Sequence, residues 1–246
     1  MDRSLETVST PDGISISVDL YRREGHTGAV VLCPGFFQSK ETATFRRLAQ
    51  ALAEGRDVLA MDFRCHGRSE GIYTFSARES ADLETVLDFA KPGYQHIGIL
   101  AFSLGAAIAI NTVSRYRAVV CSLIAVSAPS AFEEIEFTWW TPDAMRTGLQ
   151  GLEAGSGCRP GNMFLKKARP IDTIRTFHDL PTLFIHGTRD VIVGLQHSRR
   201  LYAAAPEPKR LQIIEGGRHA EALFRDDPPS FIDIVTTWYA QTFVRL

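Results

Sequence analysis

Short segments that are mainly apolar and rich in β-branched residues recur along the chain, and they constrain its fold more than any other feature. They occupy residues 29–33, 58–61, 97–101, 119–126, 182–185 and 211–214. Runs of this kind are typical of strands buried on both faces of a parallel sheet. Segments with helical character separate most of them, and these lie at residues 42–53, 77–89, 104–114, 194–204 and, at the end, 230–243. This alternation predicts a doubly wound α/β fold with right-handed crossovers.

The first twenty residues have a different pattern. Thr10-Pro11-Asp12-Gly13 has the composition of a turn between two strand-like pieces. After this turn, apolar residues at positions 14, 16, 18 and 20 alternate with polar residues at 15, 17 and 19. We interpret the second piece as a half-buried antiparallel strand at a sheet edge.

The size and charge of the chain narrow the range of its partners. The 246 residues are 45% hydrophobic and 22% charged, and the formal net charge is -1. A chain of this length can bury one large core, so we expect a single domain over residues 1–246. The near balance of 27 basic and 28 acidic residues gives no indication of a nucleic-acid partner or an anionic membrane surface.

Export and membrane insertion are not indicated by the sequence. The first six residues are polar and lack the apolar stretch of a signal peptide. No apolar run approaches the roughly 18 residues of a membrane span. The four cysteines share no metal-ligand spacing, and we expect all of them to be reduced thiols: Cys33, Cys65, Cys121 and Cys158. These features predict a cytoplasmic protein without stable membrane insertion.

The segment from residue 97 to residue 107 carries the strongest chemical signal. An apolar run leads directly into Ser103, and an alanine-rich helical stretch follows at once. A serine on such a strand-to-helix turn is lifted above the carboxyl edge of the sheet. The crowded turn needs small residues two positions away on either side, and Ala101 and Gly105 meet that need. Ser103 is therefore the candidate nucleophile, and the alternative is a serine that only caps the helix.

His219 is the histidine best placed to act as a base for this serine. A serine hydroxyl becomes an effective nucleophile only when a base accepts its proton. His219 follows the last apolar run, and sites in open α/β sheets form in loops at the carboxyl ends of strands. We expect His186 to support a turn before Gly187 and His66 to pack within its loop. The other histidines are expected at the surface or at loop edges: His26, His96, His178 and His197.

Asp190 supplies a carboxylate between Ser103 and His219 in the chain. It follows the apolar run at residues 182–185. A buried carboxylate there would accept a hydrogen bond from the imidazole, fix its tautomer and stabilise the imidazolium. The alternative is a turn or helix-capping role. Asp172 and Asp179 precede the same run and rank lower.

The chain order Ser103, Asp190, His219 on this strand pattern resembles the α/β-hydrolase family, where nucleophile, acid and histidine follow in that order. The resemblance covers nearly the whole chain. Residues 62–69, Asp-Phe-Arg-Cys-His-Gly-Arg-Ser, are similar to the family's D-x-R-G-H-G-x-S loop, with Cys65 at the usual first glycine. The resemblance implies an α/β-hydrolase fold, with a mostly parallel eight-stranded sheet, helices on both faces and a lid insertion.

The same resemblance implies an oxyanion hole. Residues 32–37 resemble the family's H-G-x segment after the third strand, with Pro34 where histidine is usual. The implied donors are the backbone N–H groups of Phe36 and Leu104. Two fixed donors aimed at a developing oxyanion contribute a few kcal/mol each in such enzymes.

Residues 128–180 contain no confident strand and occupy the position of the family's lid or cap. We predict an insertion within the single domain, because a loop this long is usually functional or has helices of its own. The insertion carries Trp139 and Trp140. These side chains either line an acyl or aromatic pocket, which is our prediction, or pack into a core.

These residues together predict a serine hydrolase that cleaves carboxylic esters of small to medium acyl groups through an acyl-enzyme on Ser103. Its partner is a small-molecule ester, and neither a metal nor an organic cofactor is implied. Relatives with haloalkane dehalogenase or epoxide hydrolase activity carry an aspartate at the nucleophile position, so Ser103 argues against both. A thioesterase or acyltransferase with the same three residues is the nearest alternative. A ligand-binding receptor or pseudo-enzyme on this scaffold is another, and the oligomeric state stays open.

Overall fold

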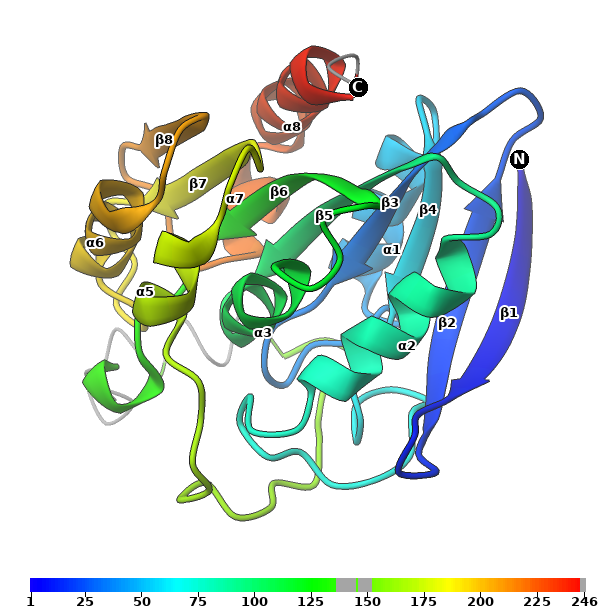
Figure 1. The fold of residues 1–246 in the computed structure, drawn as a ribbon, viewed down its shortest axis with the longest axis horizontal. Coiled ribbons are helices and arrows are strands. Elements are labelled where there is room, and N and C mark those ends of the chain that lie inside the picture. Colours follow the sequence, from blue (N-terminus) through cyan, green and yellow to red (C-terminus); the bar gives the residue numbers. More distant parts are fainter. Residues whose placement is uncertain (136–144, 146–151, 244–246) are drawn as a thin grey trace.

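The protein is built around one eight-stranded sheet (Figure 1). The computed structural model describes residues 1–135, 145 and 152–243. The strand order is β1-β2-β4-β3-β5-β6-β7-β8. Strands β3 to β8 pair in parallel with one another, whereas β1 and β2 run antiparallel to their neighbours. The strands are β1 Asp2–Ser9, β2 Ser15–Arg22, β3 Gly28–Cys33, β4 Asp57–Met61, β5 His96–Phe102, β6 Val120–Val126, β7 Thr182–Gly187 and β8 Lys209–Ile214.

Helices cover both faces of this sheet, and each face has its own apolar core (Figure 1). One face carries α2 Ser80–Ala90, α3 Leu104–Val113 and α6 Leu195–Ala204. The other carries α1 Ala43–Leu52, α7 Ala222–Asp226 and α8 Pro228–Thr242. The central strands are apolar on both faces, and in β3 Val31 joins the first core while Val30 and Leu32 join the second. The predicted eight-stranded α/β-hydrolase architecture is confirmed.

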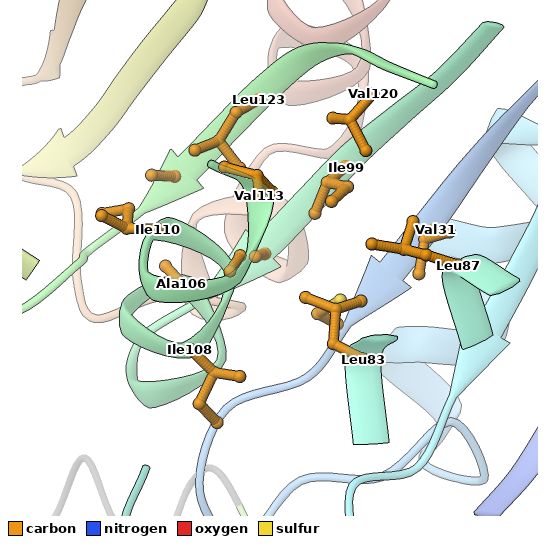
Figure 2. Close-up of a cluster of buried hydrophobic side chains, with 14 of the residues drawn as sticks. Val31, Leu83, Leu87, Ile99, Ala106, Ile108, Ile110, Val113, Val120 and Leu123 are labelled. Atoms are coloured by element: carbon orange, nitrogen blue, oxygen red, sulfur yellow. The ribbon is translucent and has the colours of Figure 1, made fainter. Parts of the chain in front are cut away.

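Helix α3 is buried along its whole length. All ten of its residues are buried, and the helix accordingly has no polar face. Figure 2 shows Ile108, Ile110 and Val113 of α3 within the cluster that also contains Leu83 and Leu87 of α2. Because α3 is packed from every side, its first turn is held firmly in place. The residue directly before that turn is Ser103.

The antiparallel edge differs from the sequence prediction. The prediction of an antiparallel strand is confirmed, but the edge strand is β1, and β2 lies one position further in with Ser17 and Asp19 buried. Asp19 accepts hydrogen bonds from the guanidinium of Arg3 and lies 3.6 Å from the ammonium of Lys40. A buried carboxylate requires such partners. The alternating pattern of β2 contains no sign of them, because they come from distant segments.

The 128–180 stretch is described at residues 128–135, 145 and 152–180. Its described elements in that part are a short 3-10 turn at Phe132–Glu134, helix α5 Pro170–Thr173 and a second 3-10 turn at Ile174–Thr176. None of the sheet's eight strands comes from the described part of this stretch. Residues 159–161 instead run beside Tyr73, whose backbone exchanges hydrogen bonds with Arg159 and Gly161.

Four parallel strands deliver the candidate site residues to one edge of the sheet. Strands β3, β5, β7 and β8 end at Cys33, Phe102, Gly187 and Ile214. The carboxyl ends of parallel strands lie at the same edge, where open α/β sheets form their sites. Loops that leave these four ends carry the residues considered next.

Candidate active site

Ser103 sits on a tight turn between β5 and α3. Its backbone φ is 51°, in a region that L-residues rarely adopt, and its N–H donates to the carbonyl of Val126 at 2.8 Å. The turn brings α3 against the loop after β3, because a Cβ added at Gly105 would lie 2.2 Å from the carbonyl oxygen of Pro34. A Cβ at Gly35 would likewise lie 3.0 Å from Ser103 Cβ. The small residues at these positions therefore permit the close approach that aims Ser103 out of the sheet edge.

The loop after β8 brings His219 to this serine. His219 Nε2 lies 3.0 Å from Ser103 Oγ, which is hydrogen-bonding distance. The loop is fastened to the end of β6, because the N–H of Ala220 donates to the hydroxyl of Ser127 at 3.0 Å. A Cβ on Gly187 would lie 2.2 Å from the Gly217 carbonyl oxygen, so the loops after β7 and β8 also touch directly.

Asp190 lies on the far side of the same imidazole. His219 Nδ1 lies 2.8 and 2.9 Å from the two carboxylate oxygens of Asp190. The backbone N–H groups of Ile192 and Val193 donate to Asp190 Oδ1 at 3.0 and 2.9 Å. The structure therefore brings together the three residues that the sequence predicts, in the order Ser103, His219, Asp190 through space.

Opposing charges set the ionisation of this pair. Burial alone would raise the pKa of Asp190, but the charge of His219 and hydrogen bonds from His186 and His219 hold it well below its usual range. Burial opposes protonation of His219, and the Asp190 carboxylate outweighs it and raises the pKa of that imidazole. The histidine is therefore a stronger base than an isolated one.

The predicted oxyanion donors lie next to the serine. Among the described residues, neither the N–H of Phe36 nor the N–H of Leu104 donates to a protein acceptor. The turn that carries Phe36 is closed by the N–H of Gln38, which donates to the Gly35 carbonyl at 3.2 Å. Two unused donors beside a serine hydroxyl suit a developing oxyanion.

A buried charge cluster supports the loop that carries Phe36. The carboxylate of Asp62 accepts the backbone N–H of Lys40 at 2.8 Å and lies 3.3 Å from its ammonium. Burial raises the pKa of Asp62 to about 6, against the effect of Lys40. Gly67 passes so close to this carboxylate that an added Cβ would lie 2.2 Å from it. The Asp62–Ser69 segment thus holds the loop after β3 in place, a contribution that the sequence motif alone did not reveal.

Histidines outside the candidate site support its loops. The imidazole of His186 lies 2.6 Å from Ser198 Oγ and 2.8 Å from the Val193 carbonyl, in keeping with the expected turn-supporting role. His66 Nε2 accepts the N–H of Phe37 at 3.1 Å, so it holds the loop after β3 rather than only its own. The expectation of a surface position for His197 is wrong, because the residue is 1% exposed and accepts the Ser130 N–H at 3.1 Å. The sequence of α6 around His197 does not reveal that Ser130 is its partner.

The ring of Phe36 begins a series of aromatic side chains. Phe36 lies 5.2 Å from Phe75 between ring centroids, and Phe75 lies 5.6 Å from Phe132. All three side chains are partly exposed. Phe75 was not among the predicted site residues. It lies outside the helices and strands, and its backbone φ is 55°. Trp139 and Trp140, the predicted pocket residues, lie outside the described residues.

Glu221 is a further acidic side chain near the histidine that the sequence analysis missed. Its carboxylate accepts a hydrogen bond from the Gln38 amide at 3.0 Å, which joins the loop after β8 to the loop after β3. Burial raises the pKa of Glu221.

No group of three or more His, Cys, Asp or Glu side chains in the described part of the chain has metal-binding geometry. No helix within residues 1–135 or 152–243 is long and apolar enough to cross a membrane.

Known proteins resemble this chain in sequence and in fold. The uncharacterized protein YfhR of Escherichia coli (strain K12) shares 45% identity over 49 residues, which are 20% of this chain and 17% of YfhR. The alignment thus spans less than a fifth of that relative. Esterase Pf2001 of Pyrococcus furiosus superimposes with a TM-score of 0.78 and 20% identity, covering 98% of this chain and 93% of the esterase. Esterase RhEst1 of Rhodococcus sp. ECU1013 gives 0.79 and 21%, covering 97% and 99%.

The family match spans most of the fold. The two solved esterases are too distant in sequence to show more than a common architecture. The model of the Alpha/beta hydrolase family, in contrast, matches residues 30–234, from β3 into α8. This span includes Ser103, Asp190 and His219, and the match supports a hydrolase. The chain belongs to the Alpha/beta hydrolase family.

Proposed function

We propose that the protein is a serine esterase that cleaves carboxylic esters of small to medium acyl groups through an acyl-enzyme on Ser103. The observation that carries the proposal is the continuous chain of contacts from Ser103 Oγ through His219 to Asp190, with distances of 3.0 and 2.8 Å. A hydroxyl, an imidazole and a carboxylate in this order are the parts of a nucleophilic relay. The family match and the esterase folds support the same reaction class.

The first half of the reaction forms the acyl-enzyme. His219 Nε2 accepts the Ser103 proton while Oγ attacks the ester carbonyl carbon. The carbonyl oxygen becomes an oxyanion and accepts hydrogen bonds from the N–H groups of Phe36 and Leu104. The imidazolium, stabilised by Asp190, then gives its proton to the departing alcohol as the ester bond breaks.

The second half of the reaction returns the serine. A water molecule gives a proton to His219 Nε2 and attacks the acyl carbon. The same two N–H groups stabilise the second oxyanion. When this intermediate collapses, His219 returns the proton to Ser103 Oγ, and the carboxylic acid leaves.

The aromatic side chains near Phe36 support an apolar acyl group. Phe36, Phe75 and Phe132 present partly exposed rings that contact one another in series, and the ammonium of Lys167 lies 4.6 Å from the Phe132 ring at the end of that series. Apolar rings of this kind bury alkyl or aryl groups and leave the polar ester to the backbone donors. We assign the acyl group to these rings, and we retain Trp139 and Trp140 of the predicted lid as further members of the pocket.

Covalent labelling of the serine tests the proposal. A p-nitrophenyl alkylphosphonate is attacked by an activated serine and remains attached as a tetrahedral adduct. We expect one adduct per chain, located on Ser103 by peptide mass spectrometry, with stoichiometric release of p-nitrophenol. The matched control is Ser114→Ala, at the far end of α3 from Ser103 and outside the relay, and this variant is expected to be labelled. Absence of an adduct on the folded wild-type protein would contradict the proposal.

Acyl thioesters distinguish the nearest alternative. A thioesterase would use the same residues, so the comparison is made between an oxygen ester and a thioester with the same acyl group. The proposal predicts oxygen-ester hydrolysis at a kcat/KM at least as high as that of the thioester. A strong preference for the thioester would replace the ester assignment. Tight binding of esters without labelling or turnover would instead favour a receptor.

A further inference from the structure

Two cysteine side chains from distant parts of the chain meet beside the candidate active site. Cys65 lies in the Asp62–Ser69 segment, and Cys158 lies 93 positions later in the chain. Both cysteines line one surface pocket, and the sulfur of Cys65 lies 3.1 Å from the carbonyl oxygen of Arg159, the residue directly after Cys158. Both are free thiols and both are partly exposed, whereas Cys33 and Cys121 are buried within strands. The first two therefore form a dithiol that small molecules can reach.

The backbone around the two thiols is fixed by hydrogen bonds. The N–H of Arg159 donates to Cys65 Sγ, and the Cys65 thiol approaches the Arg159 carbonyl at 3.1 Å. Two bonds between Tyr73 and the 159–161 segment hold the neighbouring chain at 3.1 and 2.7 Å. Cys65 has a φ of 75°, in the region that favours glycine. These hydrogen bonds therefore fix the Cys65 sulfur atom against the 158–159 backbone.

The dithiol opens into a surface pocket of about 640 Å³. Exposed residues line much of this pocket, and its charged side chains are those of Glu41, Arg46, Arg68 and Arg159, with Glu41 ion-paired to Arg46 and Arg68. Burial and the neighbouring Cys65 raise the pKa of Cys158 to about 12, so Cys158 is the partner that stays protonated. We therefore assign the first reaction to Cys65, whose sulfur faces the N–H of Arg159.

We propose that Cys65 and Cys158 are a redox-active pair that peroxide converts into a reversible disulfide. The Cys65 thiolate attacks one oxygen of hydrogen peroxide, the O–O bond breaks, hydroxide leaves, and Cys65 becomes a sulfenic acid. The Cys158 sulfur, losing its proton, then attacks the Cys65 sulfur, and the S–O bond breaks as a second hydroxide departs. The two thiol protons turn both hydroxides into water. The thiols lose two electrons, and one peroxide is reduced to two waters.

The disulfide would brace the loop that carries Phe37. His66, directly after Cys65, accepts the N–H of Phe37 at 3.1 Å. Gly157, directly before Cys158, donates its N–H to the Phe37 carbonyl at 2.9 Å. Residues next to the two cysteines therefore hold both the N–H and the carbonyl of Phe37. Phe37 directly follows the candidate oxyanion donor Phe36. Oxidation joins these two supports covalently and fastens the 152–169 segment to the Asp62–Ser69 segment.

The proposal predicts a thiol reaction and a gain in thermal stability, and neither readout requires catalysis. We expect peroxide to lower the mass of the reduced wild-type protein by about 2 Da, the mass of two hydrogens lost in disulfide formation. Peptide mapping should then link Cys65 to Cys158. A cross-link that closes a loop of this length should raise Tm by about 4 °C or more, and dithiothreitol should reverse both changes.

Two serine variants make the test specific. Cys65→Ser should show neither the mass loss nor the rise in Tm on peroxide treatment. The matched control is Cys121→Ser, because a serine hydroxyl there can still donate to the Ile97 carbonyl, now 3.5 Å from the Cys121 sulfur. This control should behave like wild type. A wild-type protein that only gains oxygen, or that links any other pair, would overturn the proposal, and a disulfide between Cys65 and Cys158 without a rise in Tm would overturn its bracing role.

Discussion

Replacing Asp190 by asparagine tests the relay at its carboxylate. The amide oxygen of the asparagine keeps an acceptor for the N–H groups of Ile192 and Val193, now at 3.0 and 2.9 Å. The amide nitrogen then faces His219 Nδ1, where the carboxylate stood at 2.8 Å. An N–H donor in that place forces the imidazole proton onto Nε2, the nitrogen that must accept the Ser103 proton. The exchange of one oxygen for NH₂ therefore removes the base without emptying the site.

The expected loss follows from this change of tautomer. An equivalent exchange in a serine protease lowers kcat by about 10⁴-fold, which corresponds to about 5.5 kcal/mol of transition-state stabilisation. We expect a fall in kcat of about 10³- to 10⁴-fold on a p-nitrophenyl ester, with KM changed much less. The matched control is Asp179→Asn, at an exposed position with a φ of 53° that asparagine tolerates. A folded Asp190→Asn protein within tenfold of wild-type kcat would refute the reasoning, as would an equal loss in the control.

Three further predictions concern the supports of the site. Gly105→Ala places a methyl group 2.2 Å from the Pro34 carbonyl oxygen, so overpacking should cost about 1–3 kcal/mol in urea unfolding and lower kcat; unchanged values would contradict the close approach. Lys40→Met leaves the buried Asp62 without its ammonium and should cost about 3–5 kcal/mol in the same assay, so a neutral effect would count against the charge cluster. Although burial opposes protonation of His219, the neighbouring carboxylate raises its pKa. Because only the neutral imidazole accepts the serine proton, kcat/KM should rise with pH with a midpoint above about 6.5, and a midpoint below it would be evidence against that pair.

The fold was predictable from the sequence because strands of a parallel sheet form recognisable apolar runs. The apolar runs at residues 97–101 and 182–185 correspond to β5 and β7, since strands buried on both faces must be apolar throughout. Helix α3 was also predictable, because the residues from Leu104 to Ile110 form one continuous apolar stretch. The burial of β2 was not predictable. Asp19 is buried because it contacts Arg3 and Lys40, and no local sequence pattern reveals these contacts.

The candidate site was predictable where chain order carries the information. Ser103, Asp190 and His219 each follow a strand-like run, and the common direction of those strands brings them to one edge. Contacts between loops were not predictable, because they depend on where the loops fold back. The bond from Gln38 to Glu221 spans 183 positions in the chain. The contact between Cys65 and Cys158 depends likewise on the path of residues 152–161.

The most direct test of the esterase assignment is hydrolysis of a p-nitrophenyl ester series, from acetyl to long acyl chains, by wild type and by Ser103→Ala. The variant removes one oxygen from the turn between β5 and α3 and leaves the backbone of that turn intact, so circular dichroism and Tm should match those of wild type. The account predicts turnover by wild type with an optimum at short to medium acyl chains, and a loss of at least about 10³-fold in the variant. Equal rates for the two proteins, or no turnover by the folded wild type at any chain length, would contradict it.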